Sequence, residues 1–231
     1  MQQLIFICFV LLLSCKSEQS KVDNWCCTEI RLLHMGSITP AARIELSYFN
    51  TSVILADCLV YTQAVPKFEY LKLDASTPPN DQGYSAYRFS AIPISGRNSS
   101  SLTSSSFQFL KGLPYTVVLC DTGLAPSWLQ LIDRAPPVGP ADTSSAYIRL
   151  VNLSNVQGAT LTVGSRVTEA TRPYMASPWL RLPAGNQRFE VRDAQQNVIR
   201  TETNNPVLLP RRVYQAYFNL DTLILVSDRF R

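Results

Sequence analysis

Short segments in which apolar and polar residues alternate recur along the chain and predict β-strands. In the segment 42–48, apolar residues alternate with Arg43, Glu45 and Ser47, which is the period of a half-buried strand. Turn-forming residues follow every eight to twelve positions or so, and helical periodicity is absent from the sequence. The predicted strands cover residues 25–35, 42–48, 53–61, 67–73, 84–94, 107–110, 115–120, 128–132, 147–154, 159–163, 166–170, 179–182, 188–192, 198–201, 207–209, 213–220 and 223–226. We therefore expect an all-β protein.

One strand signal occurs twice and predicts that a folding unit has been duplicated. The segment 147–154 (YIRLVNLS) repeats the segment 29–36 (EIRLLHMG). Further landmarks follow both copies in the same order: 70–76 with 179–185, Arg88-Phe89 with Arg188-Phe189, 111–115 with 210–214, and Asp133-Arg134 with Asp228-Arg229. The first copy is longer, with insertions before Tyr70 and between Leu73 and Arg88. We expect turn-rich loops at 76–83 and 96–106, and a two-residue hairpin turn at Gly164-Ser165.

Seven or eight short strands per copy favour two tandem immunoglobulin-like β-sandwich domains. We place domain 1 at residues 25–133 and domain 2 at 141–231. A linker at 134–140 separates them, because its three prolines resist both helix and central strand. The Cys, Trp, Cys spacing of antibody domains is absent. A single barrel across both copies is the alternative, and it fits the prolines poorly.

The N-terminal residues predict a lipoprotein signal peptide at 1–14. The apolar run Leu4–Leu13 is too short to span a bilayer but suits a signal-peptide core. It ends in Leu12-Leu13-Ser14-Cys15, which resembles the lipobox of bacterial lipoproteins, so Cys15 is expected to carry lipid and 15–24 to form a flexible tether. The first three residues supply no Lys or Arg, and a plain secretory signal or an unprocessed N-terminus is the alternative.

Four segments of the second copy together resemble domain-of-unknown-function family 4397. They are Ile148–Ser154, Leu161–Gly164, Leu182–Gly185 and Phe189-Glu190-Val191. The resemblance implies immunoglobulin-like domains, often in tandem, of bacterial envelope and surface proteins, and it carries no catalytic residues. With the lipobox, the chain looks like an outer-membrane lipoprotein of the Bacteroidota type.

The composition favours an extracytoplasmic location, and the cysteines permit disulfides there. The chain has 231 residues, of which 46% are hydrophobic and only 16% charged, a composition that favours an extracytoplasmic β protein. Once Cys8 leaves with the signal and Cys15 is acylated, an even set of cysteines remains for possible disulfides: Cys26, Cys27, Cys58 and Cys120. Their spacing does not match a zinc site. We expect neither a metal nor a cofactor.

The only histidine, His34, gives little support to an enzyme. It corresponds to Asn152 in the repeat, so a polar residue that caps a turn is a better interpretation than a metal ligand or a catalytic base. The carboxylates are scattered and follow no motif. A hydrolase is therefore the least favoured function.

Arginines and aromatic residues suggest a binding surface as an alternative function. Residues 141–231 contain eleven Arg and seven acidic residues, which accounts for the net charge of +4. Arg181, Arg188 and Arg192 are predicted at outward positions of neighbouring strands, where they could bind an anion or glycan. The alternative is a solvated face that Glu190 partly neutralises. The three tryptophans, Trp25, Trp128 and Trp179, are expected to pack in the cores or between the domains rather than to stack on sugars.

The sequence thus predicts a non-enzymatic envelope lipoprotein that acts as an adhesion, scaffold or accessory subunit at the outer membrane. A glycan- or anion-binding module beside a nutrient-uptake system is the alternative. Expected partners are the membrane, through the lipid, and an envelope protein or surface glycan. Nucleic acid is disfavoured by the compartment and the modest charge.

Overall fold

The computed structural model shows an all-β protein. It describes residues 28–35, 41–48, 51–60, 70–73, 84–94, 102–110, 113–120, 128–133, 144–202, 206–220 and 222–229. The predicted signal peptide, tether and 134–140 linker lie outside the described residues, as does the predicted loop at 76–83.

Two sheets form the first sandwich. One, the first outer sheet, has the order β3-β2-β5-β6, and the other, the first inner sheet, has the order β4-β1-β7-β8. Their strands are β1 (Thr28–His34), β2 (Ala41–Tyr48), β3 (Thr51–Val60), β4 (Tyr70–Leu73), β5 (Tyr84–Pro93), β6 (Thr103–Leu110), β7 (Tyr115–Cys120) and β8 (Trp128–Asp133).

The second sandwich repeats this arrangement. Its inner sheet has the order β12-β9-β18-β19, with β13 also paired to β9, and its outer sheet has the order β11-β10-β15-β16. A small additional sheet joins β14 to β17. The strands are β9 (Ser145–Asn152), β10 (Thr160–Val163), β11 (Arg166–Val167), β12 (Met175–Ala176), β13 (Leu180–Pro183), β14 (Gly185–Asn186), β15 (Phe189–Arg192), β16 (Val198–Thr201), β17 (Val207–Leu208), β18 (Arg212–Asn219) and β19 (Thr222–Arg229).

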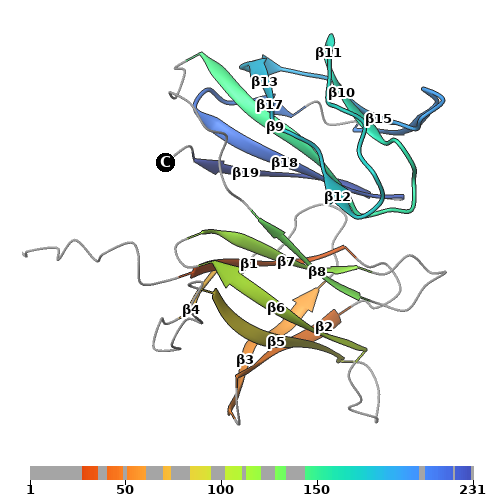
Figure 1. Ribbon diagram of the computed structural model, residues 1–231. Coiled ribbons are helices and arrows are strands. Elements are labelled where there is room, and N and C mark those ends of the chain that lie inside the picture. Colours follow the sequence, from red (N-terminus) through yellow and green to blue (C-terminus); the bar gives the residue numbers. More distant parts are fainter. Residues whose placement is uncertain are drawn as a thin grey trace, which may run out of the picture.

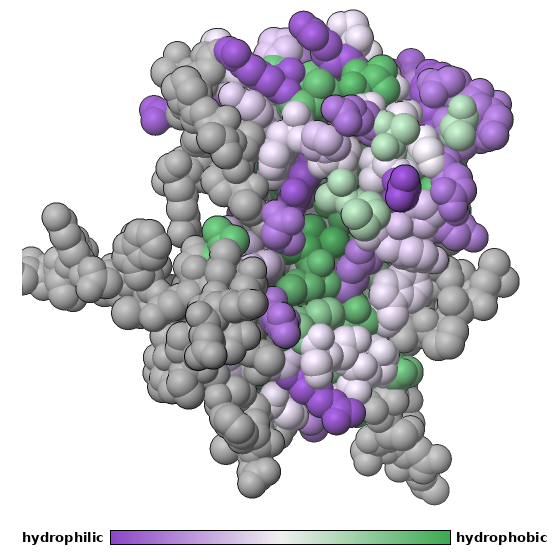
Figure 2. Space-filling model, in the orientation of Figure 1, coloured by the Kyte–Doolittle hydropathy of each residue, from purple (hydrophilic) through white to green (hydrophobic). Residues whose placement is uncertain are grey.

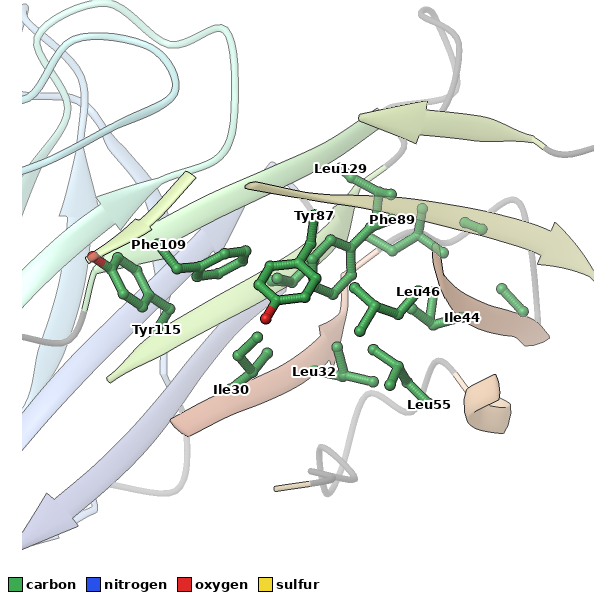
Figure 3. Close-up of a cluster of buried hydrophobic side chains, with 14 residues drawn as sticks. Ile30, Leu32, Ile44, Leu46, Leu55, Tyr87, Phe89, Phe109, Tyr115 and Leu129 are labelled. Atoms are coloured by element: carbon green, nitrogen blue, oxygen red, sulfur yellow. The ribbon is translucent and has the colours of Figure 1, made fainter. Parts of the chain in front are cut away.

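Each sandwich has its own core between its two sheets, because alternate residues of every strand point to opposite faces. The first core includes Leu32 from the inner sheet and Leu46 and Phe89 from the outer one. Aromatic rings fill much of it, and Figure 3 shows them lying between the strands. The second core joins Ile148 of the inner sheet to Phe189 of the outer one. The single barrel with one continuous core is therefore wrong.

The two sandwiches stack with their inner sheets facing each other (Figure 1). A third apolar cluster lies between these sheets and is separate from both cores. The four larger sheets of the described residues thus form one stack. The immunoglobulin-like assignment of each sandwich stays a prediction.

Most strands lie where the sequence predicts them, but β6 does not. It begins at Thr103, inside the segment 96–106 that we predicted to be a loop. Ser104 and Ser105 pair with Ser90 and Phe89 of β5, so tertiary pairing overrides the low strand propensity of a serine run. The two-residue hairpin turn at Gly164-Ser165 is confirmed, since Val163 pairs with Arg166 and Gly164 has a φ of +57°.

Candidate functional site: the junction of the two sandwiches

The inner strands are buried on both faces. On β1, Ile30 and Leu32 point into the first core, while Leu33 and Met35 point to the other sandwich. All six residues of β7 are buried. A strand covered on both faces carries apolar residues on both, as in Tyr115–Cys120, where only Thr116 is polar.

Apolar side chains from both inner sheets meet in the junction cluster. It contains Leu33, Met35, Val118, Cys120 and Ile132 from the first sandwich, and Val151, Leu153, Tyr217, Ile224 and Val226 from the second. None of them is more than 6% exposed. Full burial of an apolar side chain contributes about 1.5–3 kcal/mol, so this contact is large enough to hold the sandwiches in one orientation. Figure 2 shows a hydrophobic strip between hydrophilic side chains in the middle of the visible face, where the sandwiches meet.

A buried ion pair crosses one side of the junction. The guanidinium of Arg31 on β1 donates a hydrogen bond to the carboxylate of Asp228 on β19. The Arg31 side chain is 0% exposed and that of Asp228 is 24% exposed. A charge in this position requires a partner, because an unpaired buried ion loses its hydration without compensation.

A second arginine crosses the other side. Arg149 on β9 donates to the backbone carbonyl of Asp133 on β8, and its guanidinium lies 3.4 Å from the Asp133 carboxylate. Its Cζ also lies 4.5 Å from the ring centroid of Trp179, a cation–π contact. Burial lowers the pKa of the Arg149 guanidinium from its ordinary value, and the negative charge of Asp133 opposes that shift.

A hydrogen-bonded tyrosine lies between these two arginines. The hydroxyl of Tyr217 on β18 donates to Oε1 of Gln215 at 2.6 Å and lies 3.1 Å from Oγ1 of Thr116 on β7. Gln215 in turn donates to the carbonyl of Asp133 at 3.1 Å. Asn219 donates to the carbonyl of Met35 at 3.0 Å. Polar groups of the second sandwich therefore bind the backbone of the first at two further points.

An aromatic pair closes one edge of the junction. Trp128 of β8 packs edge-on against Tyr174, with ring centroids 5.4 Å apart, and Gln130 donates to the Tyr174 carbonyl at 2.6 Å. Tyr174 has a φ of 60°, a conformation rare for a residue with a side chain, and these contacts hold it there. The predicted packing of tryptophans between the domains is confirmed for Trp128. Trp179 contacts Arg149 of its own sandwich, and Trp25 lies outside the described residues.

The three arginines predicted to form an anion site do not share a face. Arg181 lies on β13 in the second inner sheet, whereas Arg192 lies on β15 in the outer sheet and Arg188 directly precedes that strand. The prediction of neighbouring strands is therefore wrong. Arg181 donates to Oγ of Ser145 at 3.1 Å. Arg188 and Arg192 both pair with Glu190, at 2.8 and 2.5 Å, so this carboxylate offsets part of their charge.

The capping role of His34 stays a prediction, but its counterpart in the second copy, Asn152, does cap a turn. This residue ends β9 and is fully buried. Its amide donates to the carbonyls of Val156 and Arg172, and its Oδ1 accepts from the backbone of Ser154. His34 ends β1 in the equivalent position and is also buried.

The structure places only part of the predicted cysteine set. Cys120 is fully buried at the end of β7 and belongs to the junction cluster. Cys58 lies on β3. Cys15, Cys26 and Cys27 lie outside the described residues. The disulfides and the lipid on Cys15 stay predictions.

The sequence contains a pattern that could have predicted the ion pairs of the junction. Each repeat has an arginine inside an apolar strand, in the two copies of Ile-Arg-Leu that place Arg31 and Arg149. Each also ends with Asp-Arg, which places Asp133 and Asp228. Since a charge within an apolar strand requires a partner, the pairing of these residues could have been proposed.

The described residues contain no group of three or more His, Cys, Asp or Glu side chains suited to hold a metal ion. Among these residues there is also no helix with the length and apolarity needed to cross a bilayer.

Comparisons with known proteins find only weak likenesses. No protein-family model matches the chain, so membership of family 4397 stays a prediction. No curated protein matches its sequence. Among solved structures, the chain is similar to the TIE protein of Bacillus anthracis, at 12% identity over 84% of this chain and 34% of that chain, with a TM-score of 0.28.

Two further solved structures come from Bacteroides species. A leucine-rich repeat protein of Bacteroides thetaiotaomicron matches at 11% identity over 84% of this chain and 26% of that chain, with a TM-score of 0.22. A protein of Bacteroides uniformis, described as a "putative cell adhesion protein", matches at 6% identity over 91% of this chain and 99% of that chain, with a TM-score of 0.26. The chain thus spans about a third and a quarter of the first two proteins, and likenesses this weak carry no functional argument.

Proposed function

We propose that the chain is a non-enzymatic lipoprotein of the bacterial outer membrane, in which two docked sandwiches act together as an adhesion, scaffold or accessory subunit. The observation that carries this proposal is the buried junction. Its apolar cluster and its Arg31–Asp228 pair hold the two sandwiches at a fixed angle. A body of fixed shape on a lipid tether suits the presentation of a surface to a partner.

The polar groups of the junction support a structural role. Arg31, Arg149 and Tyr217 join one sandwich to the other, and Asn152 holds a turn. Each of these four side chains thus connects parts of the fold.

The alternative, a glycan- or anion-binding module, would require a cationic face. Arg188 and Arg192 share Glu190, and Arg181 lies on another sheet. The structure therefore favours the first function over this one.

Site-specific photo-crosslinking in intact cells tests the proposal. A photoreactive amino acid is placed at Val167 or Ile54, which are exposed on the two outer sheets, and at the buried Val163 as a matched control. We expect a discrete adduct with an envelope protein or glycan from an exposed position, none from position 163, and loss of the adduct after Cys15→Ser. The proposal fails if no exposed position gives a discrete adduct, or if the adduct persists when the chain is not acylated.

A further inference from the structure

In the two inner sheets, equivalent residues of the two repeats are paired in the same way. Ile30 pairs with Tyr115 in the parallel ladder of β1 and β7, and Ile148 pairs with Tyr214 in the parallel ladder of β9 and β18. On the other side, β1 and β9 pair with β4 and β13 through Leu71 and Leu180. Superposing the repeats therefore places β1 on β9, β7 on β18 and β8 on β19.

The contacts across the junction are reciprocal under this superposition. In the first sandwich Arg31 of β1 binds Asp228 of β19, which is the counterpart of β8. In the second, Arg149 of β9 binds Asp133 of β8, which is the counterpart of β19. Arg31 and Arg149 are equivalent residues. The two aspartates differ by one position, since Asp133 pairs with Tyr115 whereas Asp228 pairs with Val213, the residue before Tyr214.

The apolar residues of the junction follow the same symmetry. Their equivalent pairs are Leu33 and Val151, Met35 and Leu153, Val118 and Tyr217, and Ile132 and Val226, all of which belong to the junction cluster. The backbone hydrogen bond that follows each parallel ladder is also repeated. The N–H of Met35 donates to the carbonyl of Leu119, and the N–H of Leu153 donates to the carbonyl of Phe218. An interface in which each side presents the same patch, related by a twofold axis, is the arrangement of a symmetric dimer.

Each docking face carries both signs of charge, so it complements a copy of itself. The first sandwich presents Arg31 together with Asp133, and the second presents Arg149 together with Asp228. A face with one arginine and one aspartate on opposite sides of a twofold axis can form two identical ion pairs with a second copy.

We propose that the inner-sheet face is a self-complementary docking surface whose partner is another sandwich of the same kind. The chain is then a fused dimer, and either sandwich, when released from the other, pairs with its counterpart in a second copy of this chain.

A charge-reversal series on the full chain tests this. Arg149→Glu together with Asp228→Arg places like charges opposite Arg31 and Asp133, while each sandwich keeps one charge of each sign. We expect this variant to have twice the wild-type mass in sedimentation equilibrium in density-matched detergent. The mirror variant, Arg31→Glu with Asp133→Arg, should give the same dimer.

Two controls make the result specific. Reversing all four residues restores opposite charges within one chain, so we expect a monomer. Arg188→Glu with Asp193→Arg makes the same exchange outside the junction and should also leave a monomer. The proposal is overturned if both two-site variants stay monomeric at every concentration, or if the four-site variant dimerises as they do. The proposal is also overturned if circular dichroism shows that both two-site variants are unfolded. Neither inner-sheet face would then be stabilised by docking with a second copy of itself.

Discussion

Leu32 and Leu33 are neighbours on β1 and provide a matched test of the junction. Both are leucines with 0% exposure, but Leu32 points into the first core and Leu33 into the junction cluster. Truncating either to alanine removes the same atoms from an equally buried site. Only Leu33→Ala removes them from the contact with the second sandwich.

The expected cost is about 3 kcal/mol for each variant, within the range for a leucine truncated in a packed core. The second sandwich can open alone only if it gives up the junction, so its opening free energy includes the junction contact. Leu33→Ala lowers that free energy by about 3 kcal/mol, which corresponds to roughly a hundredfold faster exchange of its most protected amides. Leu32→Ala leaves this contact in place.

Native-state hydrogen exchange measures the difference. We expect the slowest amides of β18 in the second sandwich to exchange about a hundredfold faster in Leu33→Ala and at the wild-type rate in Leu32→Ala. Both variants should accelerate exchange in β7 of the first sandwich. Equal rates on β18 in the two variants would refute the reasoning, since the junction would then not stabilise the second sandwich.

Three further predictions concern the second sandwich. Asn152→Ala should lower the free energy of unfolding in urea by about 1–3 kcal/mol, because buried groups of the turn lose their partner; a change below the error of the fit would contradict this role. Arg188→Ala should change stability by less than about 0.5 kcal/mol in the same titration, since its side chain is 69% exposed although paired to Glu190. Hydrogen bonds from Asn197 lower the pKa of the Asp193 carboxyl group in the folded protein. The ionised carboxylate therefore stabilises the fold above its unfolded-state pKa of about 3.9, and this stabilisation is lost as the pH falls through the lower pKa of the folded state. Asp193→Asn should therefore remove this part of the acid dependence of the melting temperature, and an unchanged acid profile would refute it.

The strands were predictable because their residues obey local rules. Alternation located β2, turn residues bounded β5, and the Gly164-Ser165 pair marked a hairpin. The start of β6 was not predictable in this way, since Ser104 and Ser105 join a strand only because β5 lies beside them. The two-residue β12 is likewise defined by its pairing with β9 rather than by its own sequence.

The positions of Arg181 and Arg188 could not be predicted from the sequence pattern. Arg181 and Arg188 are close in sequence, and a hairpin between their strands would have placed them on one surface. The chain instead crosses from the inner to the outer sheet between them, so they lie on different sheets. Alternation assigns a side chain to one face of its strand but does not say which sheet that strand joins.

The junction also explains why two arginines occupy strands that are otherwise apolar. A buried ion pair contributes little net stability compared with apolar side chains of similar size, because removing both charges from water costs about as much as their attraction returns. The apolar cluster alone, however, would tolerate several ways of sliding one flat sheet over the other. Arg31 and Arg149 lie on different inner sheets, and each must meet an acceptor on the facing sheet. Any other register leaves two buried cations unpaired, so these residues select the one orientation in which the sandwiches dock.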